Sequence, residues 1–188
     1  YLEALYDICI TINMKSNQRL IILQPNVRLV DPHTNTDDKN TLSLLSNVFE
    51  SLVKVNSSGG YEPALARCWE VSSDARHWTF HLRHPVYFHH GEMLTSMDVV
   101  ESFNRILNPD NGGELGTKGI YHGYLGGATI TSVDDFTVQL ITPTPMADLL
   151  DFLAKFSIAP RNGFKDLPGR MIGTGPYNLT SAKDGQVV

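Results

Sequence analysis

The feature that most constrains the fold is a change of hydrophobic period in the middle of the chain. Trp78, Phe80 and Leu82 alternate with polar residues, which is the period of two expected of a half-buried β-strand. After Thr95 the apolar residues instead recur every three or four positions, and Asp98 stands at the spacing of a helical capping box. The sequence therefore predicts a strand meander followed by a helix that is capped by Thr95.

Weaker patterns predict elements on both sides of this segment. The expected elements are a short buried strand over 19–24, a helix from Leu42 through about Val53, a hairpin over 128–140 with its turn at 134–135, and a helix capped by Thr144 that runs to about Lys155. The glycine-rich residues 109–127 are typical of a loop or a broken helix. Residues 1–18 carry no clear pattern.

The phase of the strands and of the capped helix also predicts a core of large aromatic side chains. We expect most of the surface of these side chains to be buried: Trp69, Trp78, Phe80, Phe88 and Phe103.

Composition narrows the class of protein. The chain has 188 residues, of which 41% are hydrophobic and 19% charged, and this composition is that of a globular protein. Its net charge is −5 without a basic run, which argues against nucleic acid as a direct partner of this segment. No apolar stretch approaches the roughly 20 residues that span a bilayer. Residues 1–19 lack the pattern of a secretory signal, so we expect any signal peptide to be absent or already removed.

The two cysteines, Cys9 and Cys68, lie far apart in the sequence. They permit one disulfide, but they form neither a disulfide framework nor a CxxC motif. A buried free thiol is the favoured interpretation, because free cysteine behaves as a small hydrophobic residue.

Five histidines within fourteen residues raise the question of a metal site: His77, His81, His84, His89 and His90, with Glu92 close by. Imidazole and carboxylate are the usual ligands of zinc. However, neighbouring residues of an extended chain point to opposite sides, and no HExxH spacing occurs. Solvated strand and turn histidines are the favoured interpretation, and a metal site is the alternative.

A series of short motifs, in order along the chain, carries a resemblance to a known family. They are LVDPH (29–33), YEPALA (61–66), CWE (68–70), WTFHLR (78–83), VYFHHGE (86–92), DVV (98–100), VDDFTV (133–138) and IGTGPY (172–177). The chain from about residue 19 to 177 resembles the family 5 extracellular solute-binding proteins, the peptide- and nickel-binding class that feeds ABC importers. Departures are Cys68 in place of a small residue, Ser96-Met97 in place of an Ala- and Glu-rich pair, and an ending where family members continue into a second lobe.

The resemblance implies an α/β fold of the class II periplasmic-binding-protein type with a mixed sheet. Residues 1–18 would be an N-terminal extension. Residues 19–188 would be the N-terminal lobe, with an inserted α+β subdomain over about residues 45–170 and an incomplete second lobe.

The resemblance also implies a function. The chain would capture a peptide or a similar small solute as the substrate-binding component of an ABC importer, in the periplasm or outside the cell, and deliver it to a permease at the membrane surface. No catalysis and no cofactor are expected. Two alternatives stay open: a cytoplasmic solute-sensing domain of a transcriptional regulator, and a metal-dependent hydrolase that uses the histidines.

Six residues are implied as ligand contacts by the family's binding segments: Asn26, His33, Asn35, Tyr121, Tyr124 and Phe156. The alternative from the residues themselves is structural, with Tyr121 and Phe156 as core aromatics and Asn35 as a turn cap. No residue is expected to bind a metal.

Overall fold

The computed structural model describes residues 7–13, 19–25, 30–34, 39–110, 120–179, 182–183 and 186–187, with the side chains of 30–34, 39–110 and 121–179. The helices are α1 (Lys39–Val48), α2 (Ser96–Leu107), α3 (Ile120–Leu125), α4 (Leu149–Leu153) and the 3-10 helix η1 (Arg161–Asp166). The strands are β1 (Asp7–Asn13), β2 (Arg19–Pro25), β3 (Val53–Val55), β4 (Tyr61–Pro63), β5 (Ala66–Val71), β6 (His77–Leu82), β7 (Thr129–Asp134), β8 (Thr137–Ile141), β9 (Ala182–Lys183) and β10 (Gln186–Val187).

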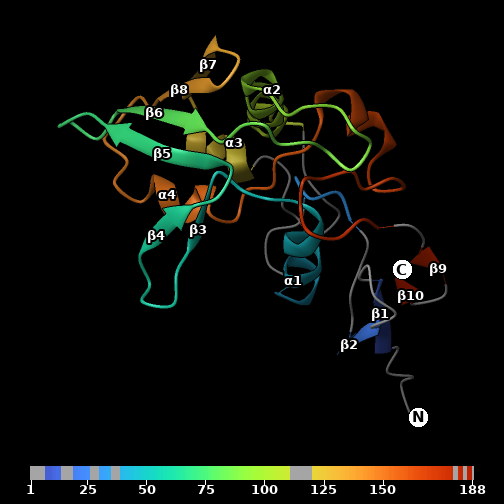
Figure 1. Cartoon of the computed structure of the whole chain (residues 1–188). Helices are drawn as coiled ribbons and strands as arrows, with labels where there is room; N and C mark the ends of the chain where they lie inside the picture. The colour runs from blue at the N-terminus through green and yellow to red at the C-terminus, as the bar shows by residue number, and fades with distance from the viewer. Residues whose placement is uncertain are drawn as a thin grey trace.

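These strands form three sheets (Figure 1). The largest is antiparallel with the order β5-β6-β8-β7, and β3 and β4 form a separate two-stranded ribbon. The third has the order β2-β1-β10-β9 and is mixed, because β1 pairs with β10 in parallel and with β2 antiparallel. This combination of helices and sheets fits the expected α/β class, and β1 lies in the stretch for which the sequence predicted no form.

The main core lies between the antiparallel sheet and the helices. Trp78, Phe80 and Leu82 are buried in alternation along β6, and α2 contributes Phe103 from its apolar stripe. The prediction of burial is confirmed for these aromatics and for Phe88.

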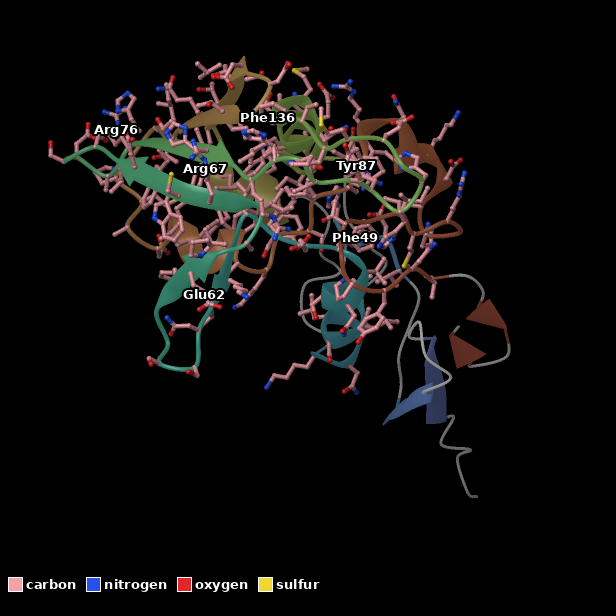
Figure 2. All side chains as sticks on the ribbon, viewed as in Figure 1. Phe49, Glu62, Arg67, Arg76, Tyr87 and Phe136 are labelled. Atoms are coloured by element: carbon pink, nitrogen blue, oxygen red, sulfur yellow. The ribbon has the colours of Figure 1, made fainter. Side chains whose placement is uncertain are left out.

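Trp69 also has most of its surface buried and packs against the same core, but it is less enclosed than the other four aromatics. Its strand β5 is at the edge of the sheet, and Cys68 and Val71 are exposed on it, as is Arg67, labelled in Figure 2. Cys68 is therefore a free but exposed thiol, contrary to the expected buried one. The side chain of Cys9 lies outside the described residues.

The capped helix begins where the sequence predicts it. Thr95 is the N-cap of α2 and forms a capping box with Asp98, whose Oδ2 accepts a hydrogen bond from the Thr95 amide at 2.9 Å. The other carboxylate oxygen of Asp98 accepts the Arg161 amide at 3.2 Å. One short motif thus starts α2 and also anchors the beginning of η1.

The predicted boundaries of two helices differ from the structure. The first helix ends at Val48 rather than Val53, since the Asn47 and Val48 carbonyls accept amides of the chain that returns at Gly175 and Tyr177. The helix expected from Thr144 begins only at Leu149.

Ahead of α4 the Met146 amide donates to the Ala75 carbonyl of the β5–β6 turn at 3.0 Å, which ties this stretch to the sheet. The hairpin predicted over 128–140 is confirmed as β7 and β8, and the short helix α3 fits the expected broken helix in the glycine-rich stretch.

The returning chain crosses α1 at a distance that only glycine permits. A Cβ atom added to Gly173 would lie 1.9 Å from the Val48 carbonyl oxygen, and one added to Gly175 would lie 2.5 Å from that of Asn47. His89 fastens the other side, because its Nδ1 accepts the Gly173 amide at 3.2 Å and its Nε2 donates to the Gly175 carbonyl at 2.9 Å. The end of α1 and the segment after η1 are therefore held together.

Candidate functional site

Four of the six predicted contact residues fall within the described side chains, and the structure brings them together. Phe156 stacks on His33 with ring centroids 5.3 Å apart, and on Phe152 at 5.5 Å. Phe152 in turn contacts Tyr121 at 5.5 Å and Tyr124 at 5.9 Å. These five rings form one aromatic cluster, which links the loop before α1 to α3 and α4. Asn26 and Asn35 lie outside the described residues.

His33 lies at the interior end of the aromatic cluster and is fully buried. Its Nε2 lies 2.9 Å from the Ser157 carbonyl and its Nδ1 lies 2.8 Å from a guanidinium nitrogen of Arg105. Because guanidinium only donates, Nδ1 must accept and Nε2 must carry the proton. Burial lowers the pKa of His33 to about 4, so the imidazole is neutral near pH 7.

Arg105 on α2 connects His33 to a carboxylate. Its guanidinium donates two hydrogen bonds to Asp31, one of them at 2.8 Å to Oδ1, and it lies over the ring of Phe164 at 5.2 Å. Burial by itself raises the pKa of Asp31, but the Arg105 hydrogen bonds and the His33 amide outweigh it and lower the pKa. Asp31, His33 and Arg105 form a satisfied polar network that fixes the loop against α2 and Ser157.

The two tyrosines lie at the outer end of the aromatic cluster. Tyr121 is partly buried, whereas 44% of Tyr124 is exposed, and its hydroxyl donates to Asp148 at 2.6 Å. Desolvation and the bond to Asp148 raise the pKa of Tyr124 to about 12, so its hydroxyl keeps its proton near pH 7. Of the four described residues, Tyr124 therefore has the most surface to offer a ligand, and His33 and Phe156 have almost none.

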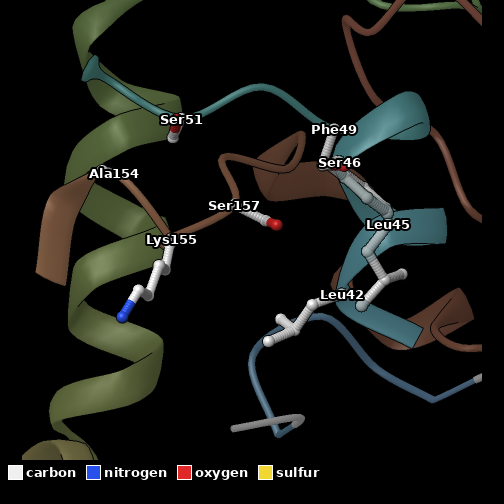
Figure 3. Close-up of a pocket in the computed structure, with 8 residues that line it drawn as sticks. All are labelled: Leu42, Leu45, Ser46, Phe49, Ser51, Ala154, Lys155 and Ser157. Atoms are coloured by element: carbon white, nitrogen blue, oxygen red, sulfur yellow. The ribbon is translucent and has the colours of Figure 1, made fainter. Parts of the chain in front are cut away.

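A hollow with a volume of about 190 Å³ lies between α1 and the segment that follows α4 (Figure 3). Its lining residues are Leu42, Leu45, Ser46, Phe49, Ser51, Ala154, Lys155 and Ser157. Figure 3 shows the Ser157 hydroxyl directed toward α1, whereas the Lys155 side chain extends away from α1. We name this hollow the α1 hollow.

The predicted residue Phe156 is one position away from the side chains that reach the α1 hollow. Phe156 and Ile158 are buried in the core, while Lys155 and Ser157 line the hollow. The Ser157 carbonyl accepts a hydrogen bond from His33 Nε2, so the polar network helps to position the residues that form this wall. The sequence offered one signal for this wall, a lysine at the end of an apolar helical stretch. It could not show which residues after α4 face the hollow, because packing sets the phase of that extended segment.

A second, more open hollow of about 400 Å³ borders the polar network at Arg105. It is lined by Glu101, Asn104, Arg105, Asn108, Asp110 and Phe164. Arg105 is the lining residue that also bonds His33. The two hollows differ in that this second one carries carboxylates and carboxamides.

The five clustered histidines have different partners. His81, His77 and His90 approach Glu70, Asp74 and Glu92 at 3.6, 3.8 and 3.4 Å. His84 stacks on Phe136 at 4.4 Å, and His89 bonds the glycine crossover. Among the described residues, no three His, Cys, Asp or Glu side chains converge as a metal site would require.

The family profile and the most similar proteins of known function agree on one family. The profile "Bacterial extracellular solute-binding proteins, family 5 Middle" matches residues 60–188. Heme-binding protein A of Haemophilus influenzae is 31% identical over 165 residues, which are 75% of this chain and 30% of that protein. The dipeptide-binding protein of Escherichia coli is 32% identical over 66% of this chain and 28% of its own length. The chain therefore spans about 30% of the length of these relatives.

Solved structures agree with the sequence matches. The periplasmic binding protein MoaA of A. tumefaciens R10, in complex with mannopinic acid, superposes with a TM-score of 0.70 at 30% identity, over 84% of this chain and 33% of that one. The HTH-type transcriptional regulator SgrR of Photorhabdus laumondii matches a shorter stretch, at 37% identity over 37% of this chain and 13% of its own length. No helix among the described residues has the length and apolarity to cross a membrane.

Proposed function

Because the chain belongs to the bacterial extracellular solute-binding proteins of family 5, we propose that it is part of the substrate-binding component of an ABC importer. It would capture a peptide or a similar small solute in the periplasm or outside the cell, and a permease at the membrane surface would receive that solute. The observation that carries the proposal is the α1 hollow, one wall of which is hydrogen-bonded to the His33 network through the Ser157 carbonyl. The proposed role is binding without catalysis.

The course of the chain supports the proposed lobe organisation. The chain leaves α1 after Val48 and returns at Gly175, where the Gly175 amide donates to the Val48 carbonyl at 2.9 Å. The intervening residues contain the antiparallel sheet and α2 to α4. We propose that residues 45–170 form an inserted subdomain of an N-terminal lobe over 19–188, with residues 1–18 as an extension.

The contact residues divide into two roles in this proposal. His33 and Phe156 hold the wall of the α1 hollow in place, because the first bonds the Ser157 carbonyl and the second stacks on His33. Tyr121 and Tyr124 are proposed as contacts at the outer end of the aromatic cluster, where both pack on Phe152. Asn26 and Asn35 stay proposed contacts that lie outside the described residues.

The test is to fill the α1 hollow. Ser46 is exposed on α1 and lines the hollow, so Ser46→Trp should occupy it without disturbing the core. Backbone amide NMR spectra, titrated with a mixture of di- to tetrapeptides, should show shifts around residues 42–49 and 154–157 for the parent chain and none for the variant. Ser58→Trp, in the exposed β3–β4 turn, is the matched control and should respond like the parent. Equal responses of Ser46→Trp and the parent would contradict the proposed site.

The match to SgrR supports a second candidate, a solute-sensing domain of a transcriptional regulator. Solute capture would be the same in both cases, and only the response would differ. The sequence upstream of this segment in its gene distinguishes them, since a helix-turn-helix there indicates the regulator and a signal peptide or lipid-attachment cysteine indicates the importer.

A further inference from the structure

We propose that His89 is an acid-sensitive latch: its neutral imidazole ties the crossover at residues 173–177 to the loop at residues 86–92, and protonation of the ring releases this tie. The proposal does not depend on the solute site, because it concerns how the segment beside α1 is held. It rests on the hydrogen bonds of His89, on the charges around it and on the hydroxyl of Thr174.

The hydrogen bonds of the His89 ring fix its protonation state. The Gly173 amide can only donate, so Nδ1, which lies 3.2 Å from it, must be unprotonated. Nε2 then carries the proton of the neutral ring and donates it to the Gly175 carbonyl at 2.9 Å. A second proton, on Nδ1, would point at the Gly173 N–H and drive the ring away. Because both nitrogens belong to one rigid ring, that movement breaks both side-chain contacts together.

The other bonds of the crossover are between backbone groups, which do not titrate near neutral pH. The His89 amide donates to the Gly173 carbonyl at 2.9 Å, and on the opposite side the Gly175 amide donates to the Val48 carbonyl at the end of α1, also at 2.9 Å. Loss of the imidazole contacts would therefore leave a single hydrogen bond between the loop and the crossover among the described residues. The crossover would be loosened on the side of the loop and would keep its contact with α1.

The charges around His89 do not compensate a protonated ring. The ionisable side chains on the loop, on the chain around the crossover and after α1 are His90, Glu92, Glu50, Arg83, Arg170 and Tyr177. The two carboxylates among them are engaged elsewhere, since Glu92 approaches His90 at 3.4 Å and Glu50 bonds Arg83 at 2.9 Å. Within the described part of the chain no carboxylate lies at ion-pair distance from His89. The closed latch thus offers the imidazolium no counter-ion.

Thr174, between the two glycines of the crossover, adds an unfavourable contribution to the closed state. Its hydroxyl oxygen is buried and has no hydrogen-bond partner among the described residues. A buried hydroxyl without a partner has given up water without a replacement. Exposure of the crossover to water would remove this cost, so the closed state depends on the His89 contacts to offset it.

His33 provides the contrasting case. Both of its ring nitrogens are also hydrogen-bonded, but it is fully buried, and burial lowers its pKa to about 4. His89 is partly exposed, so water can reach the ring and solvate its charge once the latch opens. Over the range from about pH 8 to about pH 5, in which histidine ordinarily titrates, the latch should therefore respond while His33 stays neutral.

The first experiment follows the latch in the parent chain by NMR with uniform nitrogen-15 labelling. At about pH 8, His89 should show the tautomer protonated at Nε2, with a scalar coupling across the hydrogen bond from the Gly173 amide to Nδ1. As the pH falls to about 5, the ring should take up a proton and the coupling should vanish with the same midpoint. The opposite tautomer, a coupling that outlasts protonation, or a ring still neutral at the lower pH would each overturn the proposal.

The second experiment measures hydrogen exchange of the Gly173 amide in the parent, in His89→Asn and in His90→Gln, corrected for the intrinsic pH dependence of exchange. Between about pH 8 and about pH 5, protection should fall about tenfold more in the parent than in His89→Asn, because a carboxamide oxygen accepts the amide without titrating and one hydrogen bond is on this scale. His90→Gln, at the adjacent residue, is the matched control and should behave like the parent. An equal fall in the parent and His89→Asn would assign the pH dependence to another group, such as His33, and would contradict the latch.

Discussion

Two regions of this protein are stabilised in different ways. In the sheet region, β6 and α2 bury Phe80 and Phe103 in a continuous apolar core. In the junction region, the loop before α1 is fastened through the Asp31, His33 and Arg105 network. The first region derives its stability from area removed from water, and the second from complete pairing of buried polar groups.

The difference bears on how each region tolerates change. An apolar core loses stability in proportion to the volume removed from it. A polar network fails when a single partner is lost, because the remaining groups are left buried without a hydrogen bond. The proposed solute site lies at the junction, so small changes there should affect the position of the Ser157 wall more than equal changes in the sheet.

The largest effect is expected in the sheet region. Trp78→Ala should lower the free energy of unfolding by roughly 3–5 kcal/mol, because it removes a side chain that is 4% exposed and stacks near Phe80. Urea denaturation measures it. Val71→Ala on the edge strand, where 49% of the side chain is exposed, is the control and should change little. A Trp78→Ala variant as stable as the parent would remove this residue from the core.

At the junction, Arg105→Met should cost about 3 kcal/mol in unfolding free energy, since it leaves the Asp31 carboxylate buried without its partner. The double variant Asp31→Leu, Arg105→Met should recover part of this loss, because neither charge is then left unpaired. The comparison is a double-mutant cycle by urea denaturation. Additive losses in the double variant would show that the pair is not a coupled unit.

The pH dependence of stability offers a further distinction between the regions. The pKa of His33 is lowered to about 4 in the folded chain against 6.5 for an ordinary histidine. Below pH 6.5 the unfolded chain takes up a proton that folded His33 refuses, so stability is lost as pH falls from about 6.5 to about 4.

Between pH 7 and pH 5 this loss should amount to about 2 kcal/mol. It is measured as the difference in pH dependence between the parent and His33→Gln. The same slope in both chains would mean that His33 does not resist protonation.

The smallest expected effect concerns the helix that joins the two regions. Thr95→Ala should destabilise the chain by about 1 kcal/mol through loss of the side-chain half of the capping box, and Thr95→Ser should retain most of it. Thermal unfolding of the three proteins provides the measurement. An alanine variant with the same melting temperature as the parent would mean that the Thr95 side chain contributes nothing to the cap, which would then depend on Asp98 alone.

The candidate site was predicted only in part. The family resemblance directed attention to His33 and Phe156, and both belong to the structure that supports the wall. It missed Lys155, Ser157 and the α1 residues that line the hollow itself. The reason is local, because a one-residue change of phase in an extended segment turns every side chain to the other side.

By itself the sequence determined the elements whose signals are local: the alternation that buries Trp78 and Phe80, and the capping box that starts α2 at Ser96. Tertiary structure alone decided where α1 ends, because the Asn47 and Val48 carbonyls accept the amides of Tyr177 and Gly175, more than fifty residues away. It also decided that His33 is neutral and buried rather than exposed to ligand. Hydrogen bonds between distant segments leave no periodic trace in the sequence, whereas burial of one face of a strand or helix does.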